Sequence, residues 1–431
     1  MMMKDSGVAW IGDVPRNWAV LRTKHVFRNH KDVVGARESE YERLALTLNG
    51  VIKRSKTDSN GLQPEKFDGY QIVHSNELIF KLIDLANVST SRVGLSPYEG
   101  IVSPAYIVLY PHQPSCLKFA EYFFYSLWQR EVFNHNGDEG VRSSLSADTL
   151  LNIPYVCPSV SEQQRIANFL DAKCATIDDV IAKTNESIEE YKKLKQAVIT
   201  EAVTKGVRGE RPMKDSGIDW IGQIPKDWTR TKLNRICSFH NGDRSKNYPS
   251  PNDFVDEGIP FIGADSLNGL EVNNAIAKHI MEQKYNSMGG LKISKFDILY
   301  TLRGSTIGKN AMSMFDGGTV ASSLMGIRVK SFNTLYPRFL LFWLQSEHEF
   351  IQRDMCINGS TAPNLSAEDV AAFISYMPSL GEQREIADYL DSKCAAIDTL
   401  ISKKQQFIDE LTAYKKSLIY EYVTGKKEVP A

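Results

Sequence analysis

The stretch EQQRIANFLDAKCATIDDVIAKTNESIEEYKKLKQAVITEAVTK, residues 162–205, decides the fold because it occurs twice. The second copy, EQREIADYLDSKCAAIDTLISKKQQFIDELTAYKKSLIYEYVTG, occupies residues 382–425, 220 positions later. Neither run is interrupted by proline or glycine, so each predicts one continuous helix of roughly 66 Å at 1.5 Å per residue. A repeat at a fixed offset indicates a chain built from two similar halves.

Apolar residues recur in both copies at alternating steps of four and three, the 3.5-residue period of a coiled-coil seam. The predicted seam consists of Leu170, Ile177, Ile181, Ile188, Leu390, Ile397, Ile401, Ile408 and Leu411. A helix this long with one apolar stripe needs a partner, and the other copy is the obvious one. Polar seam residues are expected to weaken the pairing and to leave room for a third element: Thr184, Lys195, Lys404 and Lys415. Two unrelated surface helices are the alternative, which the matched offset disfavours.

The starts of both helices and of both halves are also marked. Ser159 and Ser379 each precede a glutamate by three residues, the spacing of a capping box. A second repeat, MKDSGVAWIGDVPRNW from Met3 and MKDSGIDWIGQIPKDW from Met213, opens each half. We call these stretches, 3–18 and 213–228, the Trp–Pro–Trp segments. Their aromatic residues and prolines suit a segment packed against a helix end.

Between each Trp–Pro–Trp segment and its long helix lies a variable stretch, roughly 19–158 and 229–378. Alternating and apolar runs predict strands within 70–80, 100–110, 295–304 and 319–330, and amphipathic helices within 118–135 and 336–355. Similarity returns before the long helices, where 140–158 matches 360–378 at the same offset of 220. The two variable domains are therefore expected to share one fold with different surfaces.

These observations predict an α+β protein with two mixed α/β domains separated by a pair of long antiparallel coiled-coil helices. The internal repeat is expected to be pseudo-twofold and circular, since the C-terminus stops where the first half would continue. The predicted division is 1–158 for the first Trp–Pro–Trp segment and domain, 159–207 for the first spacer helix, 208–378 for the linker, second segment and second domain, and 379–431 for the second spacer helix and tail.

Composition is that of an ordinary globular chain of 431 residues, with 42% hydrophobic and 24% charged residues. The net charge of −1 argues mildly against a bulk nucleic-acid binder. We find no apolar run long enough for a bilayer and no apolar leader at the N-terminus. The six cysteines show no C-x-x-C pair and suit a reducing, cytoplasmic setting.

Catalytic motifs were sought without success. GSTIGKN, residues 304–310, has three residues between its glycines where a Walker loop needs four, so a nucleotide-binding enzyme is the weakest interpretation. The eight histidines are not spaced with cysteine or carboxylates as metal ligands would be. The sequence therefore predicts no catalytic and no metal-binding residues.

Two motifs occur twice in the positions described: SG-x-x-WIG-x-x-P-x-x-W, and LS…P-S-x-x-EQ-x-x-IA-x-x-LD-x-K ahead of the long helices. This pattern resembles the specificity subunit of type I restriction–modification systems. The resemblance implies two target-recognition domains that each read one half of a split double-stranded DNA sequence, with the coiled coil as a ruler for the gap. It also implies a non-catalytic, cytoplasmic scaffold that binds no cofactor. Two modification (methyltransferase) subunits and the restriction (translocase/nuclease) subunits would bring S-adenosylmethionine, ATP and Mg.

Within that resemblance, polar residues in the loops between strands are the candidates for reading DNA. Arg and Lys suit guanine, Asn and Gln suit adenine, and Ser and Thr suit either. In the first domain the candidates are Lys53, Arg54, Lys56, Ser89, Arg92, Arg142 and Ser143. In the second they are Arg244, Lys246, Asn247, Arg303, Ser305, Thr306, Lys309, Ser360, Thr361 and Asn364. The alternative is a coiled-coil scaffold with two protein-binding heads and no DNA specificity.

Overall fold

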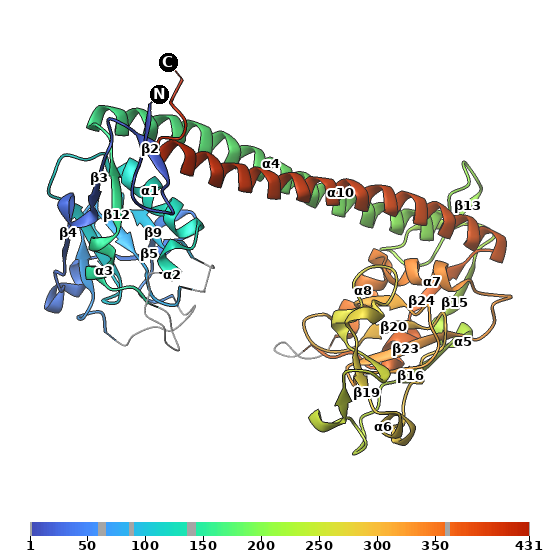
Figure 1. Ribbon diagram of the computed structural model, residues 1–431. Helices are drawn as coiled ribbons and strands as arrows, with labels where there is room; N and C mark the ends of the chain where they lie inside the picture. Colours follow the sequence, from blue (N-terminus) through green and yellow to red (C-terminus); the bar gives the residue numbers. More distant parts are fainter. Residues whose placement is uncertain (1, 59–65, 86–89, 136–143, 358–362, 431) are drawn as a thin grey trace. The chain divides into compact units, whose positions relative to one another are not determined.

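The computed structural model describes residues 2–58, 66–85, 90–135, 144–357 and 363–430 (Figure 1). The chain forms two compact units, Met1–Thr184 with Gln406–Ala431, and Asn185–Gln405. Each unit holds one sheet-rich domain and half of each long helix, α4 (Val160–Lys205) and α10 (Leu380–Val423). The helices are thus shared between the units, where the sequence analysis treated them as separate spacers.

The first unit contains two four-stranded sheets and two strand pairs. One sheet has the order β6 (Gly50–Arg54), β5 (Arg43–Thr47), β10 (Gly100–Val102), β7 (Gln71–Val73). The other has the order β4 (Phe27–His30), β11 (Ile107–Pro111), β8 (Leu78–Phe80), β9 (Val93–Leu95). The pairs are β1 (Met3–Asp5) with β2 (Asp13–Pro15), and β3 (Ala19–Arg22) with β12 (Pro154–Cys157). Its helices are α1 (Leu117–Gln129), α2 (Val132–His135) and α3 (Ala147–Asn152), with 3-10 turns at Thr23–His25 and Gly35–Glu40.

The second unit repeats this plan. Its sheets have the orders β16 (Cys237–Asn241), β23 (Leu324–Val329), β20 (Ile298–Thr301), β21 (Asn310–Met312), and β17 (Phe254–Val255), β19 (Lys278–Ile280), β18 (Ile259–Ile262), β22 (Thr319–Val320). The pairs are β13 (Met213–Asp215) with β14 (Gln223–Pro225), and β15 (Thr229–Lys232) with β24 (Ile374–Met377). Its helices are α5 (Leu233–Ile236), α6 (Glu282–Ser287), α7 (Pro337–Leu344), α8 (Glu347–Cys356) and α9 (Ala367–Ala372), with 3-10 turns at Pro251–Asp253, Ala264–Ser266 and Asn274–Ile276.

The two domains share one topology. The order β4-β11-β8-β9 in the first is the order β16-β23-β20-β21 in the second. In the other sheet, β5 pairs in parallel with β10 as β18 pairs with β22, and antiparallel with β6 as β18 does with β19. Only the fourth strand differs, because β7 lies beside β10 whereas β17 lies beside β19. The predicted α+β class with two like domains is confirmed.

Several expected elements are divided. Residues 70–80 form β7 and β8 in different sheets, with Asn76 between them at φ 65°. Residues 100–110 and 319–330 likewise each supply strands to both sheets. The helix expected at 118–135 breaks into α1 and α2 at Glu131, φ 58°, and that at 336–355 into α7 and α8. The apolar residues on both sides of these turns are buried, so hydrophobicity alone does not reveal the break.

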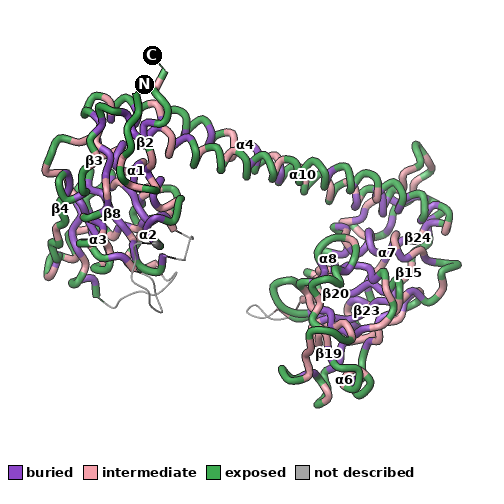
Figure 2. Tube along the Cα trace, viewed as in Figure 1, coloured by how far each residue is buried: buried purple, intermediate pink, exposed green. Residues whose placement is uncertain are grey.

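Buried positions recur among exposed ones along the long helices in each unit (Figure 2). Leu170 and Leu390 are fully buried, as are most of the cysteine and isoleucine positions that follow them; Ile181, Ile401 and Leu411 are half-buried. In the first unit the rings of Phe169 and Tyr422 lie 4.6 Å apart. Because the start of α4 lies beside the end of α10, the two helices run antiparallel.

Two of the polar seam residues that were expected to weaken the pairing form ion pairs with the neighbouring helix. Lys195 Nζ contacts Asp398 at 2.7 Å in the second unit, and Lys415 Nζ contacts Asp178 at 2.6 Å in the first. The two pairs are related by the 220-residue offset. Each lysine is about three-quarters covered, so its aliphatic stem fills the seam while its charge reaches the neighbouring helix. These ion pairs specify the register between the helices.

A buried glutamine joins each domain to the start of its long helix. Gln163 Nε2 donates to the Pro158 carbonyl at 2.9 Å, and its Oε1 accepts from the backbone N–H of Cys116 at 2.8 Å. Gln383 does the same between Pro378 and Tyr336, at 3.0 and 2.8 Å. Residues 116 and 336 are the N-caps of α1 and α7. The repeated glutamine thus satisfies buried backbone groups that would otherwise lack partners.

The aspartate of the same motif makes a second tie. Tyr122 on α1 donates its hydroxyl to Asp171 at 2.7 Å, and Arg338 on α7 bonds Asp391 at 2.5 and 2.9 Å. Ser159 and Ser379 also accept from the N–H groups of Glu162 and Glu382, which is the serine half of the expected capping box. The motif residues therefore orient each domain on its helix.

The C-terminal end of each long helix packs against a Trp–Pro–Trp segment. Gly206 (φ 79°) follows α4 beside Trp228, and Gly425 (φ 68°) follows α10 against Pro15 and Trp18. A Cβ at Gly425 would approach Pro15 to 2.4 Å, so a larger residue does not fit. In the first unit this contact brings the two chain termini close together (Figure 1), and Lys426 Nζ donates to the Ile11 carbonyl at 2.8 Å.

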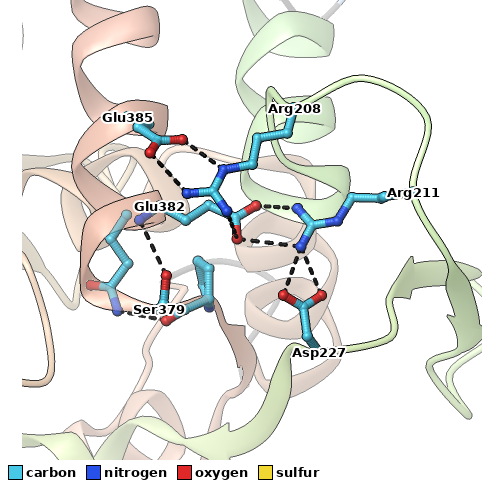
Figure 3. A network of polar contacts seen from close by, with 8 residues as sticks. Arg208, Arg211, Asp227, Ser379, Glu382 and Glu385 are labelled. Carbon is cyan, nitrogen blue, oxygen red and sulfur yellow. Dashed lines mark hydrogen bonds and ion pairs between the residues drawn. The ribbon is translucent and has the colours of Figure 1, made fainter.

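The linker after α4 is held by charged residues at the start of α10 (Figure 3). Glu382 is fully buried and pairs with Arg211, which also bonds Asp227 at 2.7 and 2.8 Å. Arg208 forms a two-bond pair with Glu385, each bond 2.8 Å long, and this hydrogen bonding lowers the pKa of the Glu385 carboxyl. The polar linker of the sequence is therefore a bonded segment of the second unit.

The glutamine tie makes a prediction with a matched control. Gln163→Met keeps the side-chain volume but leaves the Cys116 N–H and the Pro158 carbonyl unpaired, which costs about 1–3 kcal/mol of unfolding free energy. Gln164→Met, one position away on the exposed face, changes it by less than about 0.5 kcal/mol. Urea unfolding of the purified chain measures both. Equal stability of the two variants would contradict the role given to Gln163.

Candidate nucleic-acid interface

The first-domain candidates on β6 and in the turn after it are already engaged within the domain. The three cations have these partners: Lys53 with Glu42, Arg54 with Asp58, and Lys56 with the backbone carbonyl of Glu38. The hydrogen bond that Lys53 donates to Glu42 raises the pKa of Lys53. Lys53 remains about half exposed. These side chains can meet a phosphate only by exchanging or sharing those partners.

Arg92 does not lie at the surface. Its side chain is fully buried, Nη2 donates to the Asp84 carbonyl at 2.7 Å, and burial lowers the pKa of its guanidinium. The expectation that Arg92 presents itself to DNA from a polar loop is not met, because its side chain lies inside the first domain. Five other candidates lie outside the described residues: Ser89, Arg142, Ser143, Ser360 and Thr361.

The second-domain candidates include a pair of neighbouring arginines. Arg303 lies in the turn between β20 and β21, and its Nε donates to the side-chain oxygen of Asn364 at 2.9 Å. Arg244 follows β16, and its Nε donates to the Ser322 carbonyl at 3.2 Å. Burial and, secondarily, the charge of Arg303 lower the pKa of Arg244. Both acceptors are neutral, so an anion or an electron-rich base edge would relieve the repulsion.

The other second-domain candidates are less uniform. Asn247 uses its Nδ2 on the Ser287 carbonyl at 2.9 Å, whereas Lys246, Ser305 and Thr306 are exposed. Lys309 donates to Asn268 at 2.6 Å. The structure therefore brings Arg244, Arg303 and Asn364 together and leaves Asn247 partly occupied.

An open cleft of about 1320 Å³ lies beside this turn, entirely within the second unit. Thr306 and Lys309 form one wall, and three lysines of α4 contribute to the other: Lys192, Lys193 and Lys195. From the sequence, Lys195 is predicted only as a polar seam residue, and Lys192 and Lys193 are not among the predicted residues. Lys192 and Lys193 carry no motif that would have identified them, since solvated lysines are common on a long helix.

The turns between β8 and β9 and between β20 and β21 occupy equivalent places. Ile83 forms an antiparallel bridge with Ser144, and Arg303 forms one with Asn364, each pair separated by 220 residues from its counterpart. The flanking backbone bonds match as well, because Leu145 N donates to Leu82 O and Leu365 N to Leu302 O, both at 2.9 Å. Arg303 and Asn364 are among the residues predicted from the sequence, whereas Ile83, which is apolar, and Ser144 are not.

A buried ionisable cluster lies behind the second turn. Tyr300 on β20 donates to Glu349 on α8, and Arg353 Nε donates to the same carboxylate oxygen at 3.0 Å. Burial raises the pKa of Glu349 to about 7 against the opposition of Arg353, and burial also raises that of Tyr300. Gly308 (φ 85°) packs directly on the Arg353 guanidinium, where a Cβ would approach it to 2.3 Å. The cluster supports the turn from its inner side.

The described residues contain neither a candidate metal-binding cluster nor a candidate membrane-spanning helix. No group of three or more His, Cys, Asp or Glu side chains is placed to hold a metal ion. No helix in the described ranges combines the length and apolar character needed to cross a membrane.

Comparison with known proteins decides what this arrangement belongs to. Residues 225–410 match the family model described as "Type I restriction modification DNA specificity domain". The chain is 24% identical over 363 residues to the type I restriction enzyme MjaVIII specificity subunit of Methanocaldococcus jannaschii, covering 83% of this chain and 80% of that one. It is 26% identical over 330 residues to the EcoBI specificity subunit of Escherichia coli, covering 72% and 66%.

The second half of the chain thus carries a type I restriction–modification DNA specificity domain, and most of its length is similar to type I specificity subunits. The resemblance drawn from the doubled motifs is thereby confirmed, and the protein-binding scaffold without DNA specificity is not favoured. A solved chain from work on complex assembly and conformational transition of the type I R-M system has the same fold. It has a TM-score of 0.70 at 16% identity, and the match covers 96% of this chain and 99% of that chain.

The buried cluster of Tyr300, Glu349 and Arg353 predicts an unusual pH dependence of the stability of this protein. Glu349 binds its proton with a pKa of about 7 when folded and 4.5 ordinarily, so the folded state holds more protons between these values and stability falls as pH rises through them. Glu349→Gln removes this titration. From pH 5 to pH 7.5 its unfolding free energy should rise relative to the natural chain by about 2 kcal/mol.

Urea unfolding of both chains at the two pH values measures the difference. Burial lowers the pKa of the neighbouring His348 to about 4. Its contribution to the free energy of unfolding therefore has the opposite pH dependence and is lost as the pH falls below the ordinary pKa of histidine. It is present in both chains and cancels in the comparison. Parallel pH profiles of the two chains would show that Glu349 does not retain its proton.

Proposed function

We propose that this chain reads a bipartite DNA sequence, with one recognition domain for each half-site. The observation that carries the proposal is the repetition of one domain fold with different residues at equivalent surface positions, such as Ile83 and Arg303. Two copies of one frame give two similar modes of approach to DNA, and the different side chains give two different sequences.

The paired helices are the element that sets the gap between half-sites. Each is continuous, and each pairs antiparallel with the other in both units, held in register by Lys195 with Asp398 and Lys415 with Asp178. A continuous helix resists bending and compression, because shortening it would break its backbone hydrogen bonds. The recognised gap should therefore follow helix length.

Catalysis is assigned to partner subunits. In this proposal the chain selects the DNA target. Two modification subunits with S-adenosylmethionine and restriction subunits with ATP and Mg would act on that DNA in the cytoplasm. Exposed apolar residues spaced by seven on α10 (Leu400, Phe407 and Tyr414) offer a docking stripe outside the seam. The small net charge fits this division, since partners would supply much of the contact with the DNA backbone.

The test is methylation mapping of DNA from cells that express this chain with its modification subunit. Removing one heptad from each helix at facing positions, residues 183–189 and 404–410, keeps the seam in register and shortens the pair by about 10 Å. The expected result is a split motif whose halves are unchanged and whose gap is about three base pairs shorter at 3.4 Å per pair.

Three outcomes are informative. A shortened gap supports the ruler. An unchanged gap with normal methylation contradicts it while leaving DNA recognition intact. The absence of any split motif from the natural chain, in a complex that assembles and methylates DNA, overturns the proposed function itself.

A further inference from the structure

The equivalence of the two hairpin turns permits an inference about which residues distinguish the half-sites; it rests on the proposed function. The turn after β8 and the turn after β20 are each anchored to the segment before the long helix by one bridge and one flanking hydrogen bond. Because the anchoring contacts are related by the 220-residue offset, the side chains of Ile83 and Arg303 start from equivalent backbone positions of the shared domain fold. Both side chains are exposed.

The chemistry of the two side chains is opposite. In the second domain, Asn364 accepts from Arg303 Nε, so the guanidinium is oriented from one side. Among the described residues no hydrogen bond engages its two terminal nitrogens. The two terminal nitrogens therefore offer a pair of N–H donors whose planar geometry matches the O6 and N7 acceptors of guanine. Because Arg244 lies nearby and carries the same charge as Arg303, a base edge rich in hydrogen-bond acceptors is a favourable partner for the two arginines.

In the first domain the corresponding position is apolar. Ile83 is 37% exposed, and its bridge to Ser144 is a backbone contact that does not require an apolar side chain. Its bridge partner is Ser144, which is shorter than Asn364 and carries no amide. An exposed branched apolar side chain next to a small residue fits the C5-methyl group of thymine, the one apolar feature of the major groove.

We propose that positions 83 and 303 are the equivalent specificity-determining positions of the two domains, with Arg303 reading a guanine in one half-site and Ile83 contacting a thymine methyl in the other. Asn364 is a positioning residue that orients Arg303 and touches no base. The two half-sites then differ at corresponding places because the same backbone position carries a donor fork in one domain and a methyl-matching surface in the other.

The experiment is methylation mapping, by single-molecule sequencing, of DNA from cells that co-express each variant with the modification subunit. Arg303→Ala should make one guanine position degenerate in one half-site, with a loss of discrimination of roughly ten- to hundredfold. Ile83→Ala should relax one thymine position in the other half-site, by a smaller factor. The gap and all remaining positions should be unchanged in both.

Two further variants separate base reading from folding. Arg303→Lys keeps the charge but not the fork and should still relax the guanine, whereas Asn364→Ala should weaken guanine discrimination less than Arg303→Ala does. Matched controls are Arg230→Ala, on the exposed β15, and Ile52→Ala, on the exposed side of β6. Both controls should leave the motif unchanged.

The assignment is overturned if complexes with the Arg303→Ala and Ile83→Ala variants methylate the same motif as the natural chain. It is also overturned if both variants change the bases recognised in the same half-site. It is also overturned if Arg303→Lys retains full guanine discrimination, because charge alone would then suffice. In each of these cases a split motif persists, so DNA recognition by the chain stands. Only the loss of the motif from the natural chain would remove both the assignment and the proposed function.

Discussion

A helix of more than forty residues with a single apolar stripe is unstable in water unless the stripe is covered, and each long helix of this chain covers the stripe of the other. The pairing is antiparallel, so each unit contains the beginning of one helix and the end of the other. The beginning carries the glutamine and aspartate that bind the domain helix, and the end carries the glycine that accommodates the Trp–Pro–Trp segment. These contacts of the repeated segments with the domains thus depend on the seam.

The seam also explains why charged residues are tolerated inside it. Lys195 and Lys415 cover apolar surface with their stems and reach aspartates on the neighbouring helix. A partly covered ion pair adds little stability in itself, but it disfavours a shift of register, which would leave the charges unpaired. For a helix pair that measures distance, a single register matters more than maximal stability. Partner subunits would then meet a surface of defined geometry.

The recognition domains show how one frame can carry two specificities. The bridge and hydrogen bond that anchor each hairpin turn use backbone atoms, so they place few demands on the side chains that leave the turn. In the second domain, support for the turn comes from its inner side, where the buried Glu349 is bonded by the mostly covered Arg353. Separating the anchor from the reading surface allows the residues at 83 and 303 to differ without disturbing the fold. The same separation removes any sequence signal that would relate them.

The sequence by itself determined the features that repeat: the helix pair, the Trp–Pro–Trp segments, the shared α+β class and the family. These depend on local periodicity and on motifs whose contacts are close to the helix ends, such as Gln163 with Pro158. Only the tertiary structure decided that residues 70–80 make two strands, that Arg92 points inward, that Lys195 supports the seam, and that Ile83 corresponds to Arg303. Each of these depends on which distant segment packs alongside, and a side chain's exposure and partners are properties of that packing and not of its place in the chain.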